Sequence, residues 1–207
     1  MYIPKTFKVT DIKEVMDFIE QNSFGTIVTT ENGRPISTHI PLKLRKIEEF
    51  YYITGHVAYG NSQWKTIEDN EDILLMFQGP HAYVSSSWYE KENVPTWNYQ
   101  AVHLYGKGYI LDKDELVNEL AIMINTYEKG RENPVSYEKL SNEVLEKQIK
   151  GIVGFKVMIK EIQASYKLSQ NRSDIDYYNV VEKLKDEGTT NSDMVAEQMI
   201  KIKKSDG

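Results

Sequence analysis

The sequence predicts an α+β fold in which six or seven short strands, interrupted by helices, form a closed antiparallel β-barrel. Three observations predict this fold. β-Branched and aromatic residues alternate with polar ones over several short segments, as in half-buried strands. Asn32-Gly33 separates two of these segments and suits a two-residue hairpin turn, because both residues accept a positive φ. Amphipathic segments with helical spacing lie between the strands, which is typical of an α+β chain.

These patterns define the expected elements along the chain. The strands are expected at residues 24–30, 36–44, 50–54, 73–78, 81–85, 97–110 and 151–162. The helices are expected at residues 11–22, 63–70, 112–128, 141–150, 174–185 and 192–203. No internal repeat or low-complexity segment divides this series of elements.

Capping and proline positions define the first half of the chain. Thr10 can cap the first helix, in which apolar residues recur at helical spacing. Pro41 cannot donate a backbone hydrogen bond, so its strand should lie at a sheet edge or bulge there. After the third strand, a turn rich in Gly, Asn and Ser leads into the helix from about Gln63 to Asn70. The start of that helix is either an anion site, made by free N–H groups and the helix dipole, or an ordinary cap.

The second half of the chain is predicted from apolar runs and glycines. Residues 73–78 are apolar on both faces, as in a buried strand, and Gly79-Pro80 is expected to break this strand before the next one begins. Residues 97–110 alternate over a length that requires a curved strand, and Gly106 and Gly108 permit the bend. The segment YKLSQNR, which follows the last strand, is expected to be exposed and polar.

The stretch from Phe77 to Tyr105 indicates the chemistry of the site. It combines aromatic residues with serines, histidines and amide side chains, all of which can donate or accept hydrogen bonds. A flat ring with a polar edge needs apolar faces to stack on and a few fixed polar partners around its rim. The stretch therefore predicts a planar cofactor.

Composition excludes several classes of protein. There is no cysteine, which excludes disulfides and thiolate metal sites, and no pair of the four histidines has the spacing of a metal site, so no metal is predicted. A net charge of -6 argues against binding to nucleic acid by general electrostatics. No segment reaches the roughly 18 apolar residues of a membrane span, and the N-terminus lacks a signal-peptide pattern. We therefore expect a cytoplasmic protein that does not enter a membrane.

Several long segments resemble the PaiB family of FMN-binding negative transcriptional regulators, over about residues 1–185. The segments that carry this resemblance are MYIPKTF, FGTIVTTENGRPISTHIPL, GHVAYGNSQW, FQGPHAYVSSSWY, VPTWNYQAVHLYG and GIVGFKVMIKEIQASYKLSQNR. The resemblance implies a split β-barrel related to pyridoxamine-phosphate oxidase, with FMN at the interface of a homodimer. It also implies repression of degradative-enzyme and sporulation genes. We expect residues 1–172 to form the FMN-binding domain and residues 173–207 a helical hairpin packed on the barrel or the dimer.

The resemblance also places the cofactor-binding residues. The strand Thr38-His39-Ile40-Pro41 would lie along the flavin, and the turn Asn61-Ser62-Gln63-Trp64 falls where the related oxidases hold the phosphate. The remaining pocket residues would be Ser85, Ser87, Trp88, Trp97, Asn98, Lys167, Ser169, Gln170 and Asn171, some of them from the partner chain. Those oxidases use Arg and Lys where this chain has Ser62 and Gln63, so its phosphate charge would come from Lys65, Lys167 or Arg172.

Alternatives remain open at this point. The chain could be an FMN-dependent oxidoreductase or flavin reductase, although no catalytic residue is identified, or a split barrel that binds haem or another small ligand. Trp88 and Trp97 could form the dimer core instead of walls for the flavin. The last two helices have the outline of a helix-turn-helix, but Asp193 and Glu197 stand where base-contacting residues should be, which favours a packing hairpin. DNA contact, directly or through another protein, is left open.

Overall fold

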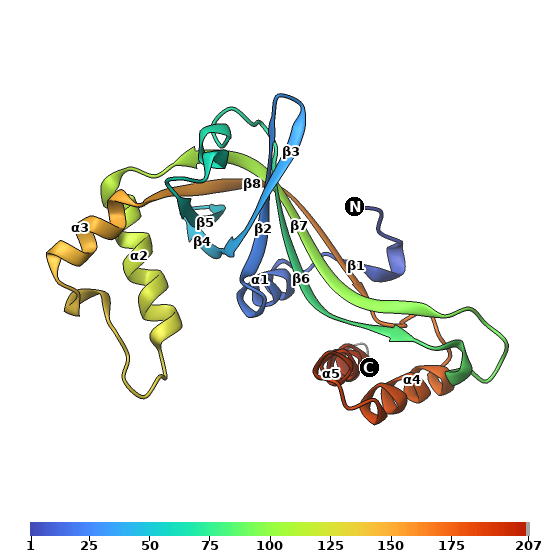
Figure 1. The fold of residues 1–207 in the computed structure, drawn as a ribbon. Helices are drawn as coiled ribbons and strands as arrows, with labels where there is room; N and C mark the ends of the chain where they lie inside the picture. The colour runs from blue at the N-terminus through green and yellow to red at the C-terminus, as the bar shows by residue number, and fades with distance from the viewer. Residues whose placement is uncertain (206–207) are drawn as a thin grey trace. The chain divides into compact units, whose positions relative to one another are not determined.

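The computed structural model describes residues 1–205, which form an antiparallel sheet and several helices (Figure 1). The strands are β1 (Lys8–Val9), β2 (Phe24–Glu31), β3 (Arg34–Pro41), β4 (Lys43–Ile47), β5 (Phe50–Ala58), β6 (Ile73–Val84), β7 (Thr96–Ile110) and β8 (Ile152–Lys167). The α-helices are α1 (Ile12–Gln21), α2 (Lys113–Glu128), α3 (Asn142–Lys150), α4 (Asp174–Asp186) and α5 (Thr190–Ser205). Four short 3-10 helices are η1 (Lys5–Phe7), η2 (Ser62–Thr66), η3 (Ser86–Trp88) and η4 (Tyr137–Lys139).

The strands pair in the order β3-β2-β6-β7-β8-β5-β4, and β1 pairs with β8. β2 and β3 form a hairpin in which Ile27 pairs with Thr38, and the turn residues Asn32 and Gly33 have φ values of 50° and 79°. The predicted hairpin is therefore confirmed. Pro41 ends β3, which is the first strand in this order, so the prediction that Pro41 lies in an edge strand is also confirmed.

The chain divides into two compact units. Unit 1 contains residues 1–18, residues 78–103 and the described residues from Gln163 onward, whereas unit 2 contains residues 19–77 and 104–162. The predicted separation of a C-terminal helical hairpin at residue 173 stays a prediction about domains. In unit 1, α4 and α5 lie side by side (Figure 1), and the Tyr177 hydroxyl donates a hydrogen bond of 2.6 Å to the carbonyl of Met199.

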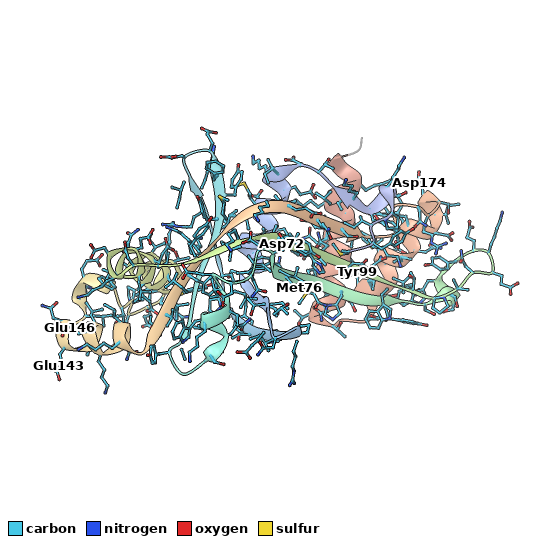
Figure 2. The ribbon with its side chains drawn as sticks, turned by 90° about the horizontal axis from the view of Figure 1, so that it is seen from above. Asp72, Met76, Tyr99, Glu143, Glu146 and Asp174 are labelled. Atoms are coloured by element: carbon cyan, nitrogen blue, oxygen red, sulfur yellow. The ribbon has the colours of Figure 1, made fainter. Side chains whose placement is uncertain are left out.

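The core of unit 2 is apolar and includes one covering helix. Ile27, Ile53 and Phe155 of the sheet are fully buried, and α2 packs through Leu116 and Leu120. Asp112 caps α2, because its carboxylate accepts a hydrogen bond from the Glu115 amide in a capping box. The short helix α3 contains no fully buried residue, and its acidic side chains Glu143 and Glu146 extend outward (Figure 2).

Three boundaries differ from the sequence prediction, and a hydrogen bond explains each difference. Asp11, not Thr10, caps α1, because its carboxylate accepts a hydrogen bond of 2.8 Å from the Lys13 amide. The predicted strand over 36–44 is two strands, because Leu42 turns its amide to the carbonyl of Ser23. The predicted helix over 63–70 is the short 3-10 helix η2, which the contacts of Gln63 described below hold in place.

Two predictions about strand ends were also wrong. β6 continues through Gly79-Pro80 to Val84. Its pairing with β2 covers only residues 74–76, so Pro80 lies beyond that ladder and does not need to donate to it. A Cβ at Gly79 would lie 2.6 Å from the Phe18 ring, so the glycine permits close packing within the strand. β8 reaches Lys167, and Tyr166 within the predicted polar segment is only 2% exposed. Its ring packs against the Phe18 ring, with the two centroids 5.3 Å apart.

Candidate functional site

In unit 2, a buried hydrogen-bond network holds residues 61–64, the turn at which the resemblance predicts the phosphate. Gln63, at the start of η2, is 2% exposed. Its Oε1 accepts a hydrogen bond of 2.5 Å from the Thr38 hydroxyl, and its Nε2 lies 3.1 Å from the Thr29 hydroxyl and 3.2 Å from the carbonyl of Ile36. Gln63 therefore ties η2 to the β2–β3 hairpin, and its amide is not free to hold a phosphate.

The neighbouring amide of Asn61 is also engaged within the protein. Its Nδ2 donates a hydrogen bond of 2.8 Å to the Thr38 hydroxyl, and its Oδ1 accepts one of 3.1 Å from the Gln63 amide. Asn61 is thus an ordinary cap of a five-residue 3-10 helix. The exposed groups left on this turn are Ser62 and Lys65.

The rest of the predicted residues in unit 2 lie at its surface or in its core. His39 is exposed on β3, whereas the next residue, Ile40, is 9% exposed. Trp64 donates its indole N–H to the carbonyl of Tyr59 at 3.0 Å and stacks on the Tyr59 ring, with the centroids 5.8 Å apart. The Nζ of Lys65 lies 5.7 Å from the Trp64 ring centroid. Ser62, Trp64 and Lys65 therefore combine a hydroxyl, an aromatic face and a cation.

Pro41 lines a pocket between α2 and strands β3, β4 and β5 that sequence reasoning missed. Its walls are mostly apolar, and its polar lining includes His56 and Glu119. Burial lowers the pKa of His56 below its ordinary value. The pocket had no sequence signal, because α2 and the strands that form it are far apart in the chain.

Unit 1 carries an exposed aromatic face made by β6 and β7. The Trp97 ring lies edge-on to the Tyr83 ring, with centroids 5.9 Å apart, and lies 6.2 Å from the His81 ring. Trp97 is 53% exposed and Tyr83 is 44% exposed, so both rings present apolar surface to solvent. Such a face can stack on a planar ligand or on a second protein surface.

Three predicted residues of unit 1 form hydrogen bonds within the unit and are not free to contact a ligand. Asn98 is fully buried; its Nδ2 donates to the Ser169 hydroxyl at 2.9 Å and lies 3.5 Å from the Met199 sulfur. The amide of Gln170 closes the turn around Ser169, because it accepts from the Leu168 N–H and donates to the carbonyl of Tyr166. Asn98, Ser169 and Gln170 therefore position the backbone of this region.

The other predicted residues of unit 1 lie nearer the surface. Ser85 caps η3 and lies 2.8 Å from the Ser87 hydroxyl, and Trp88 is half-buried in the same short helix. Asn171 is exposed. Lys167 is half-buried and donates a hydrogen bond to the Thr96 hydroxyl.

The structure thus divides the predicted residues into two sets, called clusters, one in each unit. The first cluster, in unit 2, comprises Thr38, His39, Ile40, Pro41, Asn61, Ser62, Gln63 and Trp64. The second cluster, in unit 1, comprises Ser85, Ser87, Trp88, Trp97, Asn98, Lys167, Ser169, Gln170 and Asn171. Within each cluster, surface groups that can meet a ligand lie beside buried groups that hold them in place.

Comparison with known proteins defines the class to which this fold and these clusters belong. Residues 1–161 match the family described as "Putative FMN-binding domain", and the chain belongs to this family. A curated relative from Bacillus subtilis (strain 168), "Protease synthase and sporulation protein PAI 2", is 61% identical over 96% of both chains. An uncharacterized protein of Aspergillus fumigatus is 28% identical, over 91% of this chain and 92% of its own. The resemblance to the PaiB family is confirmed.

Solved structures show the same fold. The FAD and heme binding protein from Mycobacterium smegmatis has a TM-score of 0.59 and 12% identity, covering 83% of this chain and 78% of that one. The flavocytochrome Anf3 from Azotobacter vinelandii has a TM-score of 0.57 and 16% identity, covering 86% of this chain and 78% of its own. The predicted α+β antiparallel split β-barrel with peripheral helices is therefore confirmed.

The residues present fit FMN, the cofactor that the family membership supports. A flavin needs apolar faces for its ring, hydrogen-bonding groups at its edge and donors or cations for its phosphate. Exposed rings are present at Tyr83 and Trp97, and partly exposed cations are present at Lys167 and Arg172. Among residues 1–205, no helix is long and apolar enough to cross a membrane.

Proposed function

We propose that this chain is an FMN-binding negative transcriptional regulator of the PaiB type, which represses degradative-enzyme and sporulation genes. The observation that carries the proposal is the 61% identity, over 96% of both chains, to the Bacillus subtilis protein named for protease synthesis and sporulation. The match of residues 1–161 to an FMN-binding family supports the cofactor. We further propose that the regulator is a cytoplasmic homodimer.

In this proposal the surface groups of each cluster, within its own unit, are candidate contacts for FMN. In unit 1, the exposed rings of Trp97 and Tyr83 would pack against apolar parts of the flavin or the partner. In unit 2, the exposed side chains of His39 and Ser62 would offer hydrogen-bonding groups to a polar part of the ligand. Bound FMN supplies a ring that accepts and releases electrons reversibly. Asn98 and Gln63 would act as positioning residues, because their amides hold β7 and η2 in place.

The surface of α5 supports regulation through another protein. Its first turns expose Asp193, Met194 and Glu197, which do not suit the negatively charged groove of DNA. The net charge of -6 points the same way. We therefore propose that the dimer controls transcription by contacting a protein that binds DNA.

The test combines a spectrum, a mass and a reporter. We expect purified protein incubated with FMN to retain flavin absorption after gel filtration, and to elute at twice the 24.0 kDa of one chain. A strain without the gene should show raised protease and sporulation reporters, which the wild-type gene lowers again. The purified Trp97→Ala variant should not retain flavin, and its gene should not return the reporters to wild-type levels. The Val94→Ala variant, which changes a side chain 70% exposed in the same unit, should do both.

Two results would reject the regulator. Reporters that do not respond to loss or return of the gene would remove the regulatory role. Flavin-dependent oxidation of NAD(P)H by the pure protein, together with unresponsive reporters, would instead identify an FMN-dependent oxidoreductase.

A further inference from the structure

Two cations lie together on one turn of unit 1. Lys167 is the last residue of β8, and Arg172 follows five positions later, after a turn in which Ser169 has a φ of 64°. The Arg172 amide donates a hydrogen bond of 3.0 Å to the carbonyl of Ser169, which closes the turn. Both side chains are half-buried, so each charge has lost part of its hydration.

Neutral groups hold both cations in place. The Lys167 ammonium donates a hydrogen bond to the Thr96 hydroxyl. The Arg172 guanidinium lies over the Tyr89 ring, 4.5 Å from its centroid, and Tyr89 is 8% exposed. A cation over an aromatic face keeps its N–H groups free to donate in the plane of the guanidinium. The contacts therefore orient the charges without neutralising them.

No carboxylate of the described chain balances these charges. Within residues 1–205, neither Lys167 nor Arg172 forms an ion pair. The two nearest acids in sequence are engaged elsewhere: Asp174 pairs with Lys203 at 2.6 Å, and Asp176 accepts the Glu90 amide at 2.9 Å. Burial, and then the charge of Arg172, lower the pKa of Lys167. Two close, partly desolvated cations without a counter-charge are costly unless an anion binds them.

We propose that Lys167 and Arg172 form an anion subsite for a phosphate monoester, and that the phosphate of FMN is its ligand. An arginine fork and a lysine ammonium together provide charge-assisted donors that suit a phosphate dianion. Thr96, which holds Lys167, directly precedes Trp97, so the subsite and the exposed aromatic face both lie at the start of β7. At the turn Asn61–Gln63, by contrast, the side-chain amides of Asn61 and Gln63 already form hydrogen bonds within the protein.

This inference deepens the proposed function and rests on it for the identity of the ligand. Its test compares FMN with riboflavin, which has the same ring and no phosphate, by flavin fluorescence titration of the full-length protein. Arg172→Gln and Lys167→Gln should each weaken FMN binding by about tenfold to a hundredfold, because each removes a charge-assisted contact. Riboflavin affinity should stay within about twofold, since the lost contact is to the phosphate alone.

Matched variants separate the subsite from general charge and from folding. Lys91→Gln removes one positive charge from an exposed loop of the same unit and should leave both affinities unchanged. Arg172→Lys and Lys167→Arg keep the charge and should recover most of the preference for FMN over riboflavin. Lys65→Gln tests the rival position in unit 2 and should also leave the preference unchanged.

The outcomes are distinct. An unchanged preference for FMN in both Gln variants would overturn the subsite while leaving the proposed function standing, as would loss of the preference in Lys65→Gln alone. If the wild-type protein binds no flavin, the proposed function fails and inorganic phosphate becomes the probe. Thermal stabilisation by phosphate that Arg172→Gln abolishes would then support the subsite with free phosphate as its source, and its absence would overturn it.

Discussion

Gly106 in β7 lies so close to β8 that no side chain fits at this position. A Cβ at Gly106 would lie 2.1 Å from the carbonyl oxygen of Met158 and 3.0 Å from the Val157 side chain. Backbone cannot yield as a flexible side-chain end can, so this glycine is required by close packing. Gly60 differs, because a Cβ there would meet no atom within 4 Å and its φ needs no glycine.

We expect Gly106→Ala to lower the free energy of unfolding by about 1–3 kcal/mol or more, because the added methyl overpacks the sheet. Chemical denaturation followed by circular dichroism measures the change. Gly60→Ala is the matched control and should be neutral or stabilising by up to about 1 kcal/mol. Equal effects of the two substitutions would contradict this explanation.

Asn98 is a second residue whose role follows from its contacts. Asn98→Ala would leave the buried Ser169 hydroxyl without its amide partner, so we expect unfolding free energy to fall by about 1–3 kcal/mol. Asn171→Ala, at an exposed position nearby, should change it by no more than about 0.5 kcal/mol. Urea denaturation of the two variants compares them, and an equally small loss in both would show that Asn98 is not a positioning residue.

His56 makes stability depend on pH in a defined direction. Burial lowers its pKa in the folded protein below the ordinary 6.5, so the unfolded chain binds more protons below that pH. The free energy of unfolding should therefore rise with pH up to about 6.5 and fall as pH decreases below it. Burial, followed by the N-terminal charge, also lowers the pKa of His103, which adds to the same slope.

The measurement is the melting temperature between about pH 7.5 and pH 5.5. We expect His56→Gln to flatten part of the decrease toward acid, since the glutamine does not titrate. His39→Gln, at an exposed position, serves as the control. A wild-type melting temperature that rises toward pH 5.5 would contradict the assignment.

At the scale of the elements, α2 contacts the sheet of unit 2 through the polar side chain of Glu119 as well as through Leu116 and Leu120. The carboxylate of Glu119 accepts hydrogen bonds from the Thr54 hydroxyl at 2.7 Å and from Nε of Arg45 at 3.2 Å. The Glu119 side chain is 18% exposed and that of Arg45 26% exposed, so solvent screens this pair only in part. α3, by contrast, extends its acidic residues into solvent (Figure 2).

Glu119→Ala should therefore lower the unfolding free energy by about 1–3 kcal/mol, because it leaves the Arg45 charge without its partner. Glu143→Ala on α3 removes an equal charge from an exposed position and should stay within about 0.5 kcal/mol of wild type. Guanidinium denaturation distinguishes the two. Similar values for both variants would mean that the ion pair does not hold α2.

For the whole molecule, FMN should act as a stabilising ligand. At free FMN a hundred times its dissociation constant, unfolding free energy should rise by about 2.7 kcal/mol, provided that only the folded protein binds it. For a chain of 207 residues this corresponds to a rise in melting temperature of about 5–10 °C. Differential scanning fluorimetry measures the shift; Trp97→Ala should reduce it at the same FMN concentration. A melting temperature indifferent to FMN would contradict binding to the folded state.

Local patterns in the sequence were sufficient for most of the elements and for the fold class. Asn32-Gly33 directs its hairpin because the turn depends on two adjacent residues. α2, α4 and α5 follow from apolar residues at helical spacing, and Asp112, Ser173 and Thr189 accept hydrogen bonds at their starts. The long segments shared with PaiB proteins identified the family, because they follow one another in the same order from residue 1 to residue 172. The predicted cofactor contacts themselves stay a proposal.

Only the tertiary structure decided which polar side chains are free and which already form hydrogen bonds within the protein. Gln63 meets Thr29, 34 residues away, and Asn98 meets Ser169, 71 residues away, so no local pattern could show that their amides are engaged. Distant contacts also decided that Asp174 and Asp176, the acids that follow Arg172, are engaged by Lys203 and by the Glu90 amide, 29 and 86 residues away. Hydrogen bonding and burial between distant segments override local propensity, since a buried polar group must find a partner wherever the fold places one.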